Sequence, residues 1–173
     1  MNLYLMRHGI AVARDEPGIS SDSERPLSPK GIKRLRRSAK GLARLNIPFS
    51  KVLTSPALRA RQTAEIVTQS LGLEAKLEEI SGLAPESTVD HLMLGLARFD
   101  GLEDILLVGH EPLMSDAAAF LLLNNAKASL NIRFRKGGLC CIEVTELPPN
   151  EPGVLEWHLT PKQLRLLAKT GKS

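Results

Sequence analysis

Three short apolar runs divide the chain, and each ends abruptly at polar or turn-forming residues. Residues 3–6 are Leu-Tyr-Leu-Met and residues 105–108 are Ile-Leu-Leu-Val. Residues 51–54, Lys-Val-Leu-Thr, contain a shorter apolar pair, Val52-Leu53. Continuous apolar runs that stop at a turn are typical of strands buried on both faces of a sheet. In open α/β sheets, ligands bind at the carboxyl ends of such strands. The residues that follow each run are therefore candidates for a binding site.

Helical spacing of apolar residues appears between these runs. Ser28 and Pro29 suit the N-cap and the first position of a helix, and apolar residues follow at positions 32, 35, 39 and 42. Further helices are expected over residues 55–71, where Ser55-Pro56 supplies a similar cap, and over 88–99, 112–123 and 162–169. Residues 73–80 could hold another short strand.

The alternation of strands and helices predicts an α/β fold, a three-layer α/β/α sandwich with a mostly parallel central sheet. Residues 139–147 and 154–160 have the composition of strands, and prolines and a glycine separate them. We expect these two strands to pair and to add an antiparallel edge to the sheet. The length of 173 residues favours one domain over residues 1–173.

Composition narrows the class of protein. The chain is 43% hydrophobic and 24% charged, with no apolar run long enough to span a bilayer. It also lacks the pattern of a secretory signal, so we expect a cytoplasmic protein with no membrane partner. Cys140 and Cys141 are neighbours in a strand-like run and are expected to be buried thiols rather than a disulfide. The net charge of +4 suits an anionic ligand, but 3% aromatic residues argue against a nucleic-acid partner.

Cationic and imidazole side chains follow the apolar runs. Arg7 and His8 follow the first run, Arg59 lies in the first turn of the helix after the second, and His110 follows the third. Strand ends in a parallel sheet meet at one edge, so these groups can converge. Guanidinium groups grip phosphate with paired hydrogen bonds. The pattern predicts a site for a phosphoryl group that contains two arginines and two histidines.

Four stretches of the chain resemble the motifs of the histidine phosphatase superfamily, which includes the phosphoglycerate mutases. They are Leu5-Met6-Arg7-His8-Gly9, residues 25–31 (Arg-Pro-Leu-Ser-Pro-Lys-Gly), residues 54–64 (Thr-Ser-Pro-Ala-Leu-Arg-Ala-Arg-Gln-Thr-Ala) and residues 108–112 (Val-Gly-His-Glu-Pro). They occur in the order found in that family. The short length and the form of the second stretch are most similar to the SixA-type phosphohistidine phosphatases of the superfamily.

The resemblance implies a role for each matching residue. His8 would accept the phosphoryl group, and Arg7, Arg59 and His110 would complete the phosphate pocket. Arg25 lies in a matching motif and is included as a phosphate ligand, although a surface salt bridge to Asp22 or Glu24 explains it equally well.

The expected mechanism begins with neutral His8, whose second ring nitrogen donates to a backbone carbonyl and fixes the tautomer. Protonated His110 and the arginines would stabilise the transferring oxygens. These fixed cations can take the place of magnesium, so no metal or other cofactor is expected.

The resemblance implies a phosphorylated protein partner, specifically a histidine phosphotransfer domain. The acidic insertion expected of a mutase is missing, and Glu86 or a loop carboxylate are the candidates for a proton donor. A phosphatase of a small phosphoester or sugar phosphate remains an alternative, as does a non-catalytic module that binds phosphorylated proteins. The basic face of residues 30–44 is either solvated surface or a docking site for an acidic partner. The oligomeric state stays open.

Overall fold

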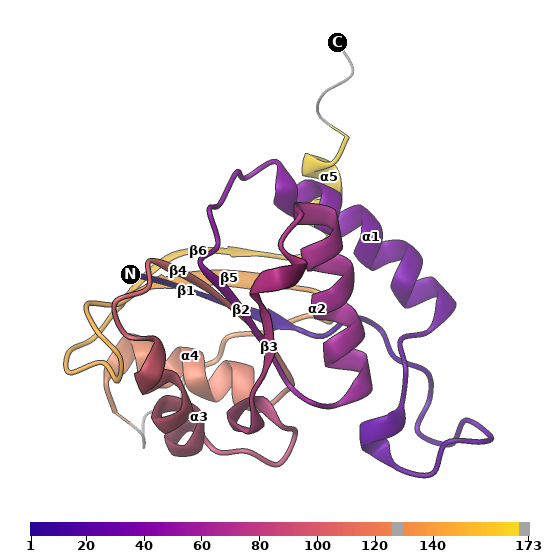
Figure 1. The fold of residues 1–173 in the computed structure, drawn as a ribbon, viewed down its shortest axis with the longest axis horizontal. Coiled ribbons are helices and arrows are strands. Elements are labelled where there is room, and N and C mark those ends of the chain that lie inside the picture. Colours follow the sequence, from indigo (N-terminus) through magenta and orange to yellow (C-terminus); the bar gives the residue numbers. More distant parts are fainter. Residues whose placement is uncertain (126–129, 170–173) are drawn as a thin grey trace.

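The computed structural model describes residues 1–125 and 130–169 as a six-stranded sheet with helices on both faces (Figure 1). The strands are β1 (Asn2–Arg7), β2 (Lys51–Thr54), β3 (Leu77–Glu79), β4 (Asp104–Gly109), β5 (Leu139–Glu143) and β6 (Val154–Leu159). The helices are α1 (Pro29–Ala43), α2 (Leu58–Leu71), α3 (Val89–Leu96), α4 (Leu113–Leu123) and α5 (Pro161–Leu167). None of the described helices is both long and apolar enough to cross a membrane.

The strand order is β3-β2-β4-β1-β5-β6. The first four strands in this order are parallel, whereas β5 runs antiparallel to both β1 and β6. This arrangement confirms the predicted α/β sandwich with a mostly parallel sheet and an antiparallel edge. Two parallel strands that are far apart in sequence, β1 and β4, become neighbours at the centre of the sheet.

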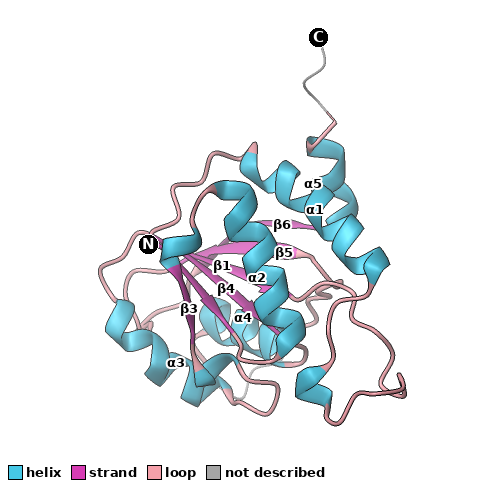
Figure 2. Ribbon diagram, turned by 45° about the vertical axis from the view of Figure 1, so that its right-hand side comes forward, coloured by secondary structure: helices cyan, strands magenta, loops and turns pink. Residues whose placement is uncertain are grey.

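Each face of the sheet has its own hydrophobic core. Leu3 and Leu5 face the cluster that contains α3 and α4, whereas Tyr4 and Met6 face the cluster beneath α1, α2 and α5. Figure 2 shows these helices on opposite sides of the sheet. All four side chains are at most 5% exposed. Burial of such a side chain contributes about 1.5–3 kcal/mol, which explains why the run 3–6 is apolar without alternation.

Several predicted boundaries were wrong, and two of them have a clear cause. Helix α2 begins at Leu58 rather than at Ser55, because the Ser55 hydroxyl accepts the Ala57 N–H and holds residues 55–57 in an extended turn. Strand β5 ends at Glu143 rather than at residue 147, because its partner β1 begins at Asn2, which pairs with Glu143. By contrast, α1 begins where expected, with the Ser28 side chain accepting the Gly31 N–H.

Candidate active site

The central strands β1 and β4 each carry a histidine directly after their last residue. Arg7 pairs with Gly109 at the end of the two ladders, and the His8 N–H donates to the Gly109 carbonyl at 2.9 Å. The imidazole centroids of His8 and His110 are therefore only 5.0 Å apart. The structure thus brings together two predicted site residues that are separated by about a hundred positions in the sequence.

His8 is held as a neutral imidazole with one nitrogen available. Its Nδ1 lies 2.7 Å from the Gly9 carbonyl oxygen. A carbonyl can only accept, so Nδ1 carries the hydrogen and Nε2 keeps its lone pair. Burial, then the neighbouring His110 and the charges of Arg59 and Arg7, lower the pKa of His8 to about 3, against the opposing effect of the Gly9 bond. An unprotonated Nε2 is the form that a nucleophile needs.

His110 differs from the expectation that it is protonated. Its side chain is buried, and Nε2 lies 2.8 Å from the Ser55 hydroxyl. Burial and the charge of Arg59 are the main causes that lower its pKa to about 3, and Asp22 only partly opposes them. His110 is therefore neutral in this structure, because an imidazolium would be both desolvated and close to guanidinium groups.

A neutral His110 still has one ring N–H that can donate a hydrogen bond. The Ser55 hydroxyl oxygen accepts the Ala57 N–H, and its own hydrogen can be donated to His110 Nε2. In that arrangement the hydrogen of the neutral ring lies on Nδ1. His110 Nδ1 is buried and has no hydrogen-bond partner among the residues that the structure describes.

Arg7 and Arg59 reach the site from the end of β1 and from the first turn of α2. One terminal nitrogen of Arg7 donates to the Phe134 carbonyl at 2.8 Å. Both terminal nitrogens of Arg59 are bonded to Asp22, one of them in a 2.8 Å ion pair with the carboxylate. The Nε atoms of both arginines are buried and have no partner within residues 1–125 and 130–169. The side chains of Arg7, Arg59 and His110 thus each keep one buried, unpaired nitrogen.

Arg25 forms a salt bridge to Asp22, which the sequence left open beside a role as a phosphate ligand, and that bridge is connected to the site. Its guanidinium contacts the Asp22 carboxylate at 2.8 Å and donates to the Val12 carbonyl. Asp22 therefore joins Arg25 to Arg59. Burial alone would raise the pKa of Asp22, but Arg59 and Arg25 outweigh it and lower the pKa below its ordinary value. Asp22 is a carboxylate at neutral pH.

The other acidic candidates lie elsewhere. Glu86 is exposed in the turn before α3, and among described residues no hydrogen bond or salt bridge joins it to the site. Glu111 accepts from the Ser115 hydroxyl at 2.8 Å within the first turn of α4, a structural role. Among residues 1–125 and 130–169, no three His, Cys, Asp or Glu side chains form a group that could hold a metal ion.

The sequence of this chain is similar to that of known phosphatases. The family model described as histidine phosphatase superfamily (branch 1) matches residues 3–83. A SixA homolog from Haemophilus influenzae, named a phosphohistidine phosphatase, is 32% identical over 133 residues, which cover 70% of this chain and 77% of the relative. This chain belongs to the histidine phosphatase superfamily.

A further sequence relative and a solved structure, both named SixA, match nearly the whole chain. Phosphohistidine phosphatase SixA of Escherichia coli is 27% identical over 96% of this chain and 98% of its own. A solved structure of the protein histidine phosphatase SixA complexed with tungstate aligns with a TM-score of 0.80 at 28% identity, over 95% of this chain and 99% of that chain. The protein is accordingly a phosphatase of this superfamily.

Sequence reasoning on this superfamily member missed several contacts around the site. Ser55 was taken only as a helix cap, yet it bonds to His110. Thr63 accepts the Gly9 N–H at 3.0 Å and donates to the Arg59 carbonyl, which ties α2 to the loop after β1. Thr63 lies in the third matching motif, so the motif itself was a signal for it. The link from Asp22 to Arg59 had no comparable signal, because it depends on how the loop folds back.

Proposed function

We propose that this phosphatase removes the phosphoryl group from a phosphohistidine of a signalling protein, through a covalent phospho-His8 intermediate. The observation that carries the proposal is the set of unpaired buried nitrogens on Arg7, Arg59 and His110 beside the His8 ring. Buried polar atoms normally have partners, and exceptions often mark the place of a catalytic group or ion. A tetrahedral oxyanion supplies the acceptors that these nitrogens lack.

The first half of the reaction transfers the phosphoryl group to His8. His8 Nε2 attacks phosphorus in line, a new N–P bond forms, and the bond to the substrate nitrogen breaks with its electron pair going to the leaving imidazole. Arg7 and Arg59 stabilise the three equatorial oxygens as charge spreads over them. The Nδ1 bond to the Gly9 carbonyl disperses the positive charge that develops on the His8 ring. In the second half, water attacks phosphorus and releases inorganic phosphate and neutral His8.

The state of Asp22 favours a phosphohistidine substrate. An alkyl alcohol is a poor leaving group without a proton donor, and Asp22, the carboxyl group bonded to Arg59, has a lowered pKa and holds no proton near neutral pH. When the N–P bond of a protonated phosphohistidine breaks, its imidazole leaves as a neutral group without such help. The names of the relatives in Escherichia coli and Haemophilus influenzae support the same substrate class. Tungstate, in the solved relative, is a tetrahedral oxyanion like phosphate.

A substrate comparison with a His8 variant tests the proposal. Wild-type protein should release phosphate from a histidine-phosphorylated phosphotransfer domain with a kcat/KM at least a hundredfold above that for a panel of sugar phosphates and alkyl phosphoesters. His8→Ala should lower turnover of the phosphoprotein by about a thousandfold or more, because covalent catalysis is lost. His91→Ala is the matched control, since His91 is an exposed histidine on α3, and it should keep wild-type turnover.

Two results would overturn the proposal. Turnover retained by His8→Ala would reject the nucleophile, and a preference for phosphoesters in wild type would reject the substrate class. Rapid quenching with phosphoprotein should also trap acid-labile phosphate on wild-type protein. Binding of the phosphoprotein without any phosphate release would instead support a non-catalytic binding module.

A further inference from the structure

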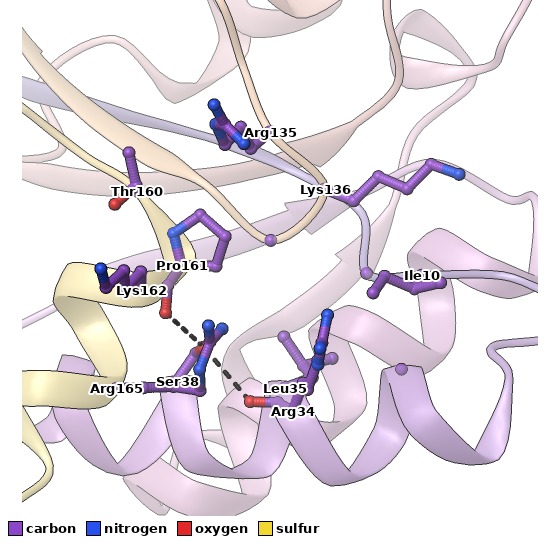
Figure 3. A pocket seen from close by; sticks show the side chains of 13 residues that line it. Ile10, Arg34, Leu35, Ser38, Arg135, Lys136, Thr160, Pro161, Lys162 and Arg165 are labelled. Atoms are coloured by element: carbon purple, nitrogen blue, oxygen red, sulfur yellow. Dashed lines mark hydrogen bonds between the residues drawn. The ribbon is translucent and has the colours of Figure 1, made fainter.

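A cationic hollow lies next to the phosphate pocket. Its volume is about 670 Å³, and it is formed by α1, the start of α5, the loop before β5 and the residues that follow His8. Five cationic side chains line it, and we call this hollow the basic groove: Arg34, Arg135, Lys136, Lys162 and Arg165. In Figure 3, Arg34 and Arg165 rise from α1 and α5 toward the loop that carries Arg135 and Lys136.

Within the described part of the chain, no acidic side chain neutralises the positive charge of the basic groove. No aspartate or glutamate lines it, and none of its five cations forms a salt bridge within the described part of the chain. Basic side chains at the opposite edge of the sheet do have acidic partners: Arg61 contacts Glu79, and Lys51 contacts Glu78. A local excess of one charge sign raises the local concentration of oppositely charged ligands.

The basic groove lies beside the residues of the phosphate pocket, although Arg7, His8, Arg59 and His110 do not line it. Gly9, which follows His8, lines the groove, as does Gly137, whose N–H donates to the carbonyls of Arg7 and His8 at 2.9 and 3.0 Å. The charges of the pocket arginines also act on Lys136: burial, then Arg7, Arg25 and Arg59, lower the pKa of this lysine. A ligand with its phosphoryl group at His8 is therefore close to a surface that attracts further negative charge.

The distribution of the cations indicates what occupies the groove. Arg34, Arg135, Lys136 and Lys162 are exposed, and the buried floor contains Leu35, Ser38 and small glycines. Sites for small molecules bury most of the ligand against apolar walls with a few fixed polar groups. Exposed long side chains around an open floor instead suit several carboxylates on the surface of a protein.

We propose that the basic groove binds aspartate and glutamate side chains that flank the phosphohistidine on the protein substrate. This inference rests on the proposed function and adds a recognition element to it: phosphate contacts select the modified residue, and the groove selects its acidic surroundings. Lys33, Arg36 and Lys40 are also exposed on α1, but they do not line the groove. The proposal therefore concerns the groove and not the other basic side chains of this helix.

The test uses two chemically phosphorylated peptides of twelve residues, each with one histidine, flanked by four glutamates in one peptide and by four glutamines in the other. At low salt, wild-type protein should hydrolyse the glutamate peptide with a kcat/KM roughly tenfold above the glutamine peptide, mostly through KM. The groove variant Arg34→Gln/Arg135→Gln/Lys162→Gln should lose this preference and hydrolyse the glutamine peptide at the wild-type rate. Unchanged hydrolysis of the glutamine peptide also shows that the variant folds.

A matched control has the same change in charge on the part of α1 that does not line the groove. Lys33→Gln/Arg36→Gln/Lys40→Gln should keep the tenfold preference. An equal rate for both peptides in wild type, or the same preference in the groove variant, would overturn the proposal.

Failure of the proposed function gives a different result. In that case neither peptide is hydrolysed, whereas a phosphoester is. Binding of the unphosphorylated peptides then tests whether the groove recognises acidic side chains. A Kd for the glutamate peptide at least fivefold lower in wild type than in the groove variant supports the groove on its own. Equal Kd values reject it.

Discussion

At the scale of residues, the site combines two neutral imidazoles with closely placed guanidinium groups. Protonation of either His8 or His110 would add a desolvated cation beside Arg7 and Arg59, which explains why both pKa values fall to about 3. The same neutrality makes His8 available as a nucleophile throughout the physiological range. A bound phosphoryl group brings negative charge that offsets the arginines, so it favours protonation of His110 during the reaction.

The two histidines should make stability depend on pH in a defined direction. Both folded-state pKa values lie below the value of about 6.5 in the unfolded chain, so the unfolded chain binds more protons between pH 6.5 and 3. The stabilisation is fully present above pH 6.5 and is lost as the pH falls toward 3. Each histidine contributes a slope of up to about 1.4 kcal/mol per pH unit in that window.

Urea unfolding at pH 7.5, 6.0 and 5.0 measures this slope. The free energy of unfolding of wild-type protein should fall more steeply with acid than that of His110→Asn, which retains one of the two groups. Parallel curves for the two proteins would show that His110 does not have a lowered pKa in the folded chain.

At the scale of elements, a 3-10 helix in the long loop after β1 presents Asp22 to the site. This helix, Asp22–Glu24, follows an exposed segment and ends at Arg25, which binds the same carboxylate. Asp22 occupies both terminal nitrogens of Arg59. An oxyanion that approaches Arg59 must therefore share or displace these bonds, and it meets a like charge.

Removal of the Asp22 charge should strengthen binding of inorganic phosphate. Asp22→Asn should lower the inhibition constant of phosphate about fivefold, the equivalent of roughly 1 kcal/mol for one unfavourable charge at a partly exposed site. Glu24→Gln is the control, because Glu24 is exposed on the same 3-10 helix and forms no salt bridge with a described residue. Weaker phosphate binding in Asp22→Asn would mean that Asp22 mainly positions Arg59.

The elements differ in how well the sequence predicts them. Strands β1 and β4 were predictable because both faces of each strand are buried, which requires an unbroken apolar run. The end of β5 was not, because it is set by the first residue of a strand more than a hundred positions away. For the same reason, local sequence indicated His8 and Arg59 but not the Asp22 bridge or the basic groove. Both of these depend on tertiary contacts between loops and helices.

At the scale of the whole molecule, the groove and the phosphate pocket depend on how closely α1 packs against α5 and the loop after β1. A Cβ atom added at Gly41 would lie 1.8 Å from the Leu164 carbonyl oxygen of α5, and one added at Gly31 would lie 2.0 Å from the Ile10 carbonyl oxygen. The obstacle is backbone in both cases, so it cannot move aside as a flexible side chain would. These two glycines allow α1 to form one wall of the basic groove.

Substitution at Gly41 should therefore destabilise the whole fold. Gly41→Ala forces α1 and α5 apart and should lower the free energy of unfolding by about 1–3 kcal/mol, the usual effect of overpacking. Gly95→Ala is the matched control within α3, where an added Cβ meets no atom within 4 Å. Alanine favours a helix over glycine by about 1 kcal/mol, so this control should be as stable as wild type or more stable. Urea denaturation with a common m-value measures both changes. Equal stability of Gly41→Ala and Gly95→Ala would mean that α5 is not held against α1 at this distance, and the wall of the groove formed by Lys162 and Arg165 would lose its support.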